Sequence, residues 1–332
     1  MKKRRLSLLV LAAMTVQLLS PAGSAAAAGG TPLQPEDTVY SVPAAPNVDY
    51  NMNTDWKFRL ADVQIGTDTQ PVKTALQNTV DAQGRKLYEK DFDDSSWETV
   101  SVPHNYSDDA LFDDLAQGGG DGGNRAIALY RKHFTVGAEY EGKKMLLEFE
   151  GLRQAAFVWV NGQYIGSYGA GVDPFGMDIT AHVVCGQDNV IAGVNDGTTG
   201  RGMTQYHKET RPGSAPGERD GAAYQWNSND FNPTVAGLTC DVILHVKNPV
   251  YQTLPLYSNL KTMGAYVYGS DFDIPEKTAT ITVEAEVRNE SNAAADLSLE
   301  VAVVDRNGKL QYTFTSDGTE NVPAAADKGT VF

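Results

Sequence analysis

Four side chains close together in the sequence combine an aromatic ring with amide and carboxylate groups: Trp226, Asn229, Asp230 and Asn232. A tryptophan ring offers an apolar face on which a pyranose ring can stack, and amide and carboxylate groups can form paired hydrogen bonds with sugar hydroxyls. They lie in a long connection, 196–236, and loops of more than about 15 residues are uncommon unless they are functional or disordered. We therefore predict a sugar-binding loop. The alternative is a surface insertion with Asx turns around Pro233.

Other residue types that could support chemistry are present without the required spacing. The five histidines are scattered, so the sequence predicts no metal site and no cofactor. The acidic groups at 91–94 and 108–114 lack the glycine-containing spacing of a calcium loop, and we interpret them as solvated turns and a helix N-terminus. Cys185 and Cys240 lie in apolar strand-like contexts and could form a disulfide or remain two buried thiols.

The body of the chain is predicted to be all-β, because apolar or β-branched runs alternate with turn residues. We expect strands at 87–92, 97–102, 127–136, 144–151, 154–160, 189–195 and 241–246. Asn161-Gly162 predicts a tight type I′ hairpin. Two helices are possible, at 72–83 and 108–116. The spacing of the strands is typical of a sandwich or jelly-roll over 48–249.

A second β segment is predicted over 250–332. Its strands are expected at 266–274, 279–291 and 295–316, with a hairpin at Asn307-Gly308. These resemble the opening strands of an immunoglobulin-like sandwich. Such a sandwich needs about seven strands, and we expect only four or so here, so the domain is predicted to be partial.

The N-terminus has the pattern of a secretory signal peptide, assigned to 1–28. A basic cluster at 2–5 precedes an apolar stretch and a run of small residues with a cleavage site around 25–28. The apolar stretch of 14 residues is too short to span a membrane. We expect a secreted protein with an extended leader over 29–47. The net charge of −15 argues against nucleic acid and anionic membranes as partners.

The order of several motifs carries a family resemblance. They are DFDDSSWETVSVPHN (91–105), LYRKHF (129–134), LEFEGLRQAAFVWVNGQYIGSYGAGVDPFGMDIT (147–180), NVIAGVND (189–196), QWNSNDFNPTVAGLTCDVILHV (225–246) and YQTLPLYSNLKTMGAYVYGSDFDI (251–274). Together they resemble the N-terminal part of glycoside hydrolase family 2, the β-galactosidase and β-glucuronidase family. The resemblance implies a galactose-binding-like jelly-roll, an immunoglobulin-like sandwich and then a catalytic (β/α)₈ barrel. It also implies that Asp230 and Asn232 lie near residues that contact sugar or a cation in relatives.

The resemblance implies that catalysis depends on two glutamates of the barrel, one of which follows an asparagine. A barrel takes about 250 residues, and far fewer follow residue 249. We therefore expect neither the barrel nor a catalytic residue on this chain. The single Asn-Glu pair, Asn289-Glu290, ends an alternating strand and is interpreted as structural.

These observations predict the non-catalytic N-terminal region of a secreted, β-galactosidase-like hydrolase. It would contribute sugar binding and a scaffold to a catalytic barrel, with a β-galactoside-like carbohydrate as its ligand. Two alternatives stay open: a stand-alone secreted carbohydrate-binding module, and a structural β-protein of the cell surface.

Overall fold

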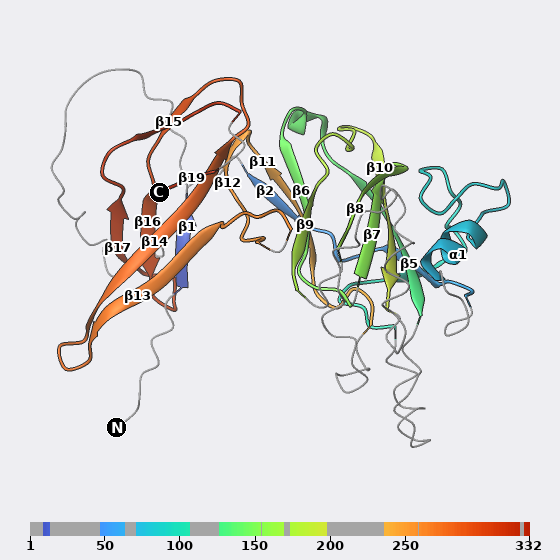
Figure 1. Cartoon of the computed structure of the whole chain (residues 1–332), viewed down its shortest axis with the longest axis horizontal. Coiled ribbons are helices and arrows are strands. Elements are labelled where there is room, and N and C mark those ends of the chain that lie inside the picture. The colour runs from blue at the N-terminus through green and yellow to red at the C-terminus, as the bar shows by residue number, and fades with distance from the viewer. Residues whose placement is uncertain are drawn as a thin grey trace, which may run out of the picture. The chain divides into compact units, whose positions relative to one another are not determined.

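The structure, a computed structural model, describes residues 9–13, 47–63, 71–106, 126–153, 155–168, 173–197, 236–257, 259–325 and 329–332. In these residues the chain consists of β-strands, one α-helix and one short 3-10 helix, which confirms the all-β fold class (Figure 1). None of the helical segments among them has the length and apolar character needed to cross a membrane. The predicted helix at 108–116 lies outside the described residues.

The chain divides into two compact units. The jelly-roll unit comprises Asp49–Val246 with Ser258–Leu260, and the second unit comprises Met1–Val48, Lys247–Tyr257 and Lys261–Phe332. The elements are β1 Leu9–Ala13, β2 Val48–Asn51, β3 Trp56–Leu60, α1 Pro71–Asn78, β4 Glu98–Val100, β5 Ile127–Thr135, η1 Ala138–Tyr140, β6 Lys144–Phe149, β7 Ala155–Val160, β8 Gln163–Tyr168, β9 Phe175–Asp178, β10 Asp188–Asp196, β11 Val242–Lys247, β12 Val250–Gln252, β13 Ala265–Asp273, β14 Thr278–Asn289, β15 Ala295–Leu297, β16 Glu300–Val304, β17 Leu310–Thr315, β18 Glu320–Val322 and β19 Thr330–Val331.

The jelly-roll unit is a sandwich of two antiparallel sheets. The larger sheet has the strand order β4-β3-β5-β10-β7-β8, and the smaller has the order β2-β11-β6-β9. Alternate residues of both sheets meet in one core, in which Trp56, Tyr130, Leu147 and Phe175 are buried. Period-2 alternation therefore turns one face of each sheet inward, as a sandwich requires.

The large sheet also buries its outer face. Val72 and Leu76 of α1 and Leu87 and Phe92 of the following segment pack there with Trp159 of β7. The central strands of the sheet are apolar on both faces for this reason, and β7 is buried at every position. Such continuous burial is typical of a sheet that is covered on both sides.

The Asn161-Gly162 hairpin is confirmed. It joins β7 to β8, and its two residues have φ angles of 50° and 84°, as a type I′ turn requires. The Asn161 side chain donates to the backbone oxygen of His182 and accepts from the backbone N–H of Val190. The turn residue thus also fixes the neighbouring connection to β10.

Two local expectations need correction. Residues 87–92 form turns rather than a strand, because their backbone oxygens accept hydrogen bonds from the side chain of Arg131. The helix predicted over 72–83 is present but ends at Asn78. There β-branched Thr79 and Val80 follow, and Val80 pairs with Lys86 in an isolated bridge.

The second unit is also built of antiparallel strands. β14 pairs with β12, β13 and β19, β16 pairs with β17 and β1, and β15 pairs with β18. Ala285, Val301 and Val303 are buried in its core. The Asn307-Gly308 hairpin joins β16 to β17, with Gly308 at a φ of 79°. β1 lies within the segment for which the sequence predicts a signal peptide.

Both cysteines are free thiols in the structure. Cys185 and Cys240 are each partly exposed, and burial raises the pKa of the Cys185 thiol above its ordinary value. The structure thus contains two separate thiols, as one of the two options proposed, but neither thiol residue is fully buried as that option expected.

Candidate functional site

The four predicted sugar-contacting residues, Trp226, Asn229, Asp230 and Asn232, lie outside the described residues. The residues on either side of their connection are described. Asp196 ends β10 and Ala236 precedes β11, and both are buried. The residues at these two ends therefore show how the connection is attached to the sandwich.

Three hydrogen bonds donated by backbone N–H groups hold these residues together at one edge of the sandwich. We call this set of bonds the neck. The backbone N–H of Tyr106 donates to the oxygen of Ala236 at 3.1 Å, and the N–H of Ala236 donates to Oδ1 of Asn105 at 2.9 Å. The N–H of Gly197 donates to the oxygen of Ala126 at 3.1 Å. The neck thus joins the residues that flank both 107–125 and 198–235. It continues the pairing of β10 with β5, whose last pair is Asp196 with Ile127.

Gly237, the residue after Ala236 of the neck, cannot be replaced by a residue with a side chain. Its φ is +109°, and a Cβ atom there would lie 2.6 Å from the backbone oxygen of His104 and 2.7 Å from the Tyr130 hydroxyl. The backbone oxygen of Gly237 also accepts from the N–H of Arg153 at 3.1 Å. Glycine is required because the backbone is left-handed and closely approached by two other segments.

Buried polar groups lie beneath the neck. Arg153, Asn195 and Asp196 are each no more than 3% exposed. The Asn195 amide donates to the backbone oxygens of Arg153 and Ala155 at 2.8 and 3.1 Å. Burial raises the pKa of Tyr106, the charge of Asp196 raises it further, and the positive charge of Arg153 opposes both. Asp196 and Arg153 thus both act on the Tyr106 hydroxyl. These two opposite charges lie at the base of the predicted sugar-binding loop.

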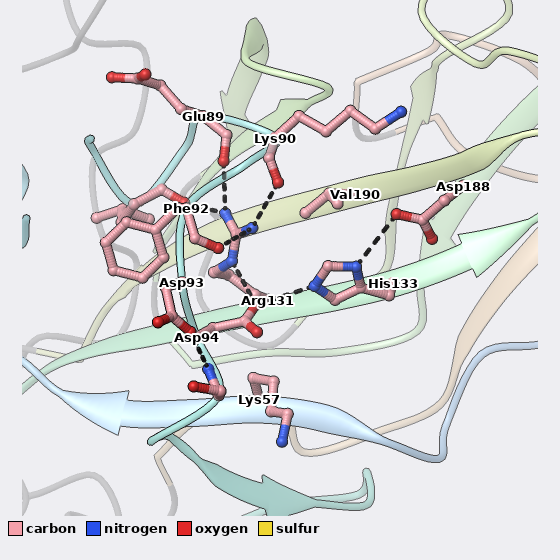
Figure 2. Close-up of polar contacts among 12 residues, drawn as sticks. Lys57, Glu89, Lys90, Phe92, Asp93, Asp94, Arg131, His133, Asp188 and Val190 are labelled. Carbon is pink, nitrogen blue, oxygen red and sulfur yellow. Dashed lines mark hydrogen bonds and ion pairs between the residues drawn. The ribbon is translucent and has the colours of Figure 1, made fainter. Parts of the chain in front are cut away.

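A second polar cluster is centred on Arg131, in the middle of β5 (Figure 2). Its guanidinium is fully buried and donates from Nε to Oδ2 of Asp94 at 2.6 Å. The remaining nitrogens donate to four backbone oxygens, those of Leu87, Glu89, Lys90 and Phe92. Its central carbon lies 5.1 Å from the centre of the Phe92 ring. One side chain therefore organises the whole turn segment over the outer face of the large sheet.

His133 contacts the same carboxylate from the solvent side. Its Nε2 lies 3.1 Å from Oδ2 of Asp94, and its Nδ1 lies 3.3 Å from Oδ2 of Asp188. Burial pushes the pKa of Asp94 upward, but the hydrogen bonds from His133 and Arg131 outweigh it and hold that pKa below its ordinary value. The interpretation of Asp94 as a solvated turn residue is therefore wrong, because it is buried and carries two cationic partners.

The sequence analysis did not predict this cluster, although the position of Arg131 in the sequence indicates it. Arg131 directly follows the apolar first half of β5, which ends in the buried Tyr130, and a charge in such a buried strand is costly unless it is paired. No comparable signal marks its partners, which lie about 40 residues away in the sequence. The cluster is fully engaged in internal contacts, so we interpret it as structural.

The Asn289-Glu290 pair lies at the end of β14, whose last residue is Asn289. Asn289 is fully buried, and its amide donates to the backbone oxygens of Ala293 and Val322 at 2.8 and 3.0 Å. The carboxylate of Glu290 accepts from the Tyr251 hydroxyl at 2.7 Å. Elsewhere in the described ranges, no three His, Cys, Asp or Glu side chains are grouped so as to hold a metal ion.

Comparison with known proteins shows to which protein family the sandwich belongs. A family profile described as "Glycosyl hydrolases family 2, sugar binding domain" matches residues 50–205. The chain carries the sugar-binding domain of glycosyl hydrolase family 2. The matched range begins within β2 and ends beyond β10, so it contains most of the neck, whereas Ala236 lies outside it.

Individual relatives of this family 2 region are glycosidases. A β-glucuronidase of Formosa agariphila is 34% identical over 79% of this chain, and a β-galactosidase of Thermoanaerobacter pseudethanolicus is 36% identical over 32% of it. The solved structure of a β-glucuronidase from glycoside hydrolase family 2 matches 88% of the chain with 31% identity and a TM-score of 0.68. The chain spans only 23% of the first relative and 27% of the solved chain. The predicted family resemblance is confirmed, as is the jelly-roll and immunoglobulin-like fold.

Proposed function

We propose that this chain is the N-terminal, non-catalytic region of a secreted family 2 glycosidase, and that it supplies sugar contacts and a scaffold. The observation that carries the proposal is the family's sugar-binding domain over residues 50–205. The relatives include both β-glucuronidases and a β-galactosidase, so the ligand class is a β-linked glycoside. We assign bond hydrolysis to the part of the family enzymes that this chain does not cover.

Within this proposal, the connection anchored by the neck contacts the sugar. Trp226 provides the stacking surface, and Asn229, Asp230 and Asn232 provide groups for paired hydroxyls. The neck supports this assignment, since it holds both ends of the connection on a rigid sandwich. A binding site is more precise when rigid elements of the scaffold support the residues that form it.

Sugar binding should be visible in the tryptophan fluorescence. Trp56, Trp97 and Trp159 are 1%, 6% and 3% exposed, so we do not expect a saccharide to contact any of these three rings. We expect galactose or glucuronate to shift or quench the emission with a dissociation constant in the millimolar range, because stacking and a few hydrogen bonds amount to about −4 kcal/mol. Trp226→Ala should abolish the change.

Three comparisons decide this prediction. Trp97→Phe, which keeps an aromatic ring at a buried position, should retain the sugar-dependent signal. Asp230→Ala should weaken binding with little change in melting temperature, because the proposed role of this carboxylate is to contact the sugar and not to stabilise the fold. Retention of the full signal in Trp226→Ala would contradict the site assignment. The absence of any signal with both sugars at tens of millimolar would contradict sugar binding itself.

Export of the protein follows from the proposed signal segment. Expressed with its native N-terminus in a bacterial host, the protein should be processed around residues 25–28 and recovered outside the cytoplasm. N-terminal sequencing of the recovered protein measures the cleavage position. Replacing the basic residues at 2–5 by glutamine should slow processing, whereas recovery of the intact N-terminus in the cytoplasm would contradict the assignment.

A further inference from the structure

His133 bridges three separate parts of the jelly-roll unit. It projects from β5 and lies between Asp94, in the turn segment before β4, and Asp188, the first residue of β10. Figure 2 shows the imidazole lying between the two carboxylates, beside the buried guanidinium of Arg131. About 44% of the His133 side chain remains exposed, so protons reach it from solvent.

The geometry requires the ring to carry both of its protons. An ionised carboxylate only accepts hydrogen bonds, so each ring nitrogen must donate. A neutral imidazole has a single N–H and can satisfy only one of the two carboxylates. The hydrogen bond to Asp94 is the largest cause that raises the pKa of His133 above its ordinary value, and the bond to Asp188 adds to it.

Two other cationic side chains, Arg131 and Lys57, lie on the strands around the ring. Arg131, on the same strand, keeps its charge and shares Oδ2 of Asp94. Lys57 of β3 donates to the Thr99 hydroxyl at 2.9 Å. The cross-strand neighbour of His133 on β10 is Val190, which is apolar. His133 is therefore the group in this cluster whose charge changes near neutral pH.

We propose that His133 is a pH-sensitive clip that fastens the 87–94 segment to the large sheet. The buried Arg131 guanidinium donates hydrogen bonds to the backbone oxygens of the segment, and His133 binds the Asp94 carboxylate of the segment from the solvent side. The segment covers the outer apolar cluster that contains Trp159. Loss of the charge on His133 leaves one carboxylate without its donor and favours local opening of this cover.

The pH range of the clip follows from the two shifts. The pKa of His133 is raised in the folded state, so its stabilisation is complete below the unfolded value of about 6.5 and is lost as pH rises through the folded value. The pKa of Asp94 is lowered, so its contribution is present above its unfolded value and is lost as pH falls through the folded one. The clip is closed between these two limits.

Hydrogen exchange of the 87–94 segment tests the proposal in the full chain. The N–H of Phe92 donates to the Glu89 oxygen, and the N–H of Asp93 donates to Oδ2 of Asp81, so both are protected only while the segment is folded. We expect their protection factors, corrected for intrinsic exchange, to fall about threefold to tenfold between pH 6 and pH 9. Mass spectrometry of peptides that cover this segment measures the change.

His133→Gln retains an amide donor but does not titrate, so its protection should be independent of pH over this range. His182→Gln is the matched control, because His182 lies on the connection before β10 and should leave the wild-type pH dependence intact. An NMR titration of His133 should also give a folded pKa above that of a free histidine. Equal pH dependence in His133→Gln and the wild type would overturn the clip, as would a folded pKa at or below the free value.

Discussion

Arg131→Met is expected to lower the free energy of unfolding of the jelly-roll unit by about 3–5 kcal/mol. Removing one partner of a buried ion pair leaves the other charge uncompensated, which is the costly case for such pairs. Asp94 would lose its closest cationic partner, and four backbone oxygens of the turn segment would lose their donor. Methionine fills a similar volume, so a cavity contributes little to the loss. Urea unfolding, followed by tryptophan fluorescence, measures the change.

Lys57→Met is the control for this experiment. Lys57 pairs with Arg131 across β3 and β5, but its amine bonds only to the Thr99 hydroxyl, in an exposed contact. We expect a loss within about 0.5 kcal/mol for this variant, as for other surface substitutions. A double variant with Asp94→Asn should lose much less than the sum of the single losses, since the two residues form one pair. An Arg131→Met loss below about 1 kcal/mol would show that the turn segment does not depend on the guanidinium.

Trp159→Ala should destabilise the same unit by a similar amount, about 3–5 kcal/mol. Trp159 is 3% exposed, and its ring stacks on Tyr88 with centroids 5.6 Å apart and contacts Tyr164 at 5.2 Å. Truncation removes this packing from a strand that is buried on both faces, so the surroundings collapse only partly. Thermal unfolding, followed by far-UV circular dichroism, measures the loss.

Tyr312→Ala provides the matched comparison. Tyr312 lies on β17 of the second unit and is 69% exposed, so its loss removes little buried surface. We expect its melting temperature to match that of the wild type. If Trp159→Ala and Tyr312→Ala lose equally little, Trp159 does not anchor the outer cluster.

The strands and hairpins were predictable because their causes are local. Asn161-Gly162 supplies both positive φ angles from two adjacent residues, and the alternation in β14 is visible in a short stretch of sequence. Residues 87–92 also alternate, yet they form turns. Their backbone oxygens are satisfied by Arg131, which lies about 40 residues further along, and no periodicity reports such a contact.

Only part of the candidate site was predictable from the sequence. The family resemblance carried the sugar-binding assignment of the sandwich, and the profile match confirms it. The roles of Trp226 and Asp230 rest on residue type alone and stay predictions. The neck could not be foreseen, because Gly237 needs its conformation only when His104 and Tyr130 approach it from distant parts of the chain.

The neck has a consequence for how such a domain can diversify. The two long connections leave and re-enter the sandwich at points already joined by backbone bonds, such as Tyr106 to Ala236 and Gly197 to Ala126. The entropic cost of closing a flexible loop rises only with the logarithm of its length, by roughly 0.6 kcal/mol for each doubling. Connections of different length and composition can therefore be exchanged above the neck while the sandwich below keeps its stability. A single scaffold can in this way acquire new ligand preferences through insertion and replacement of loops, without repacking its core.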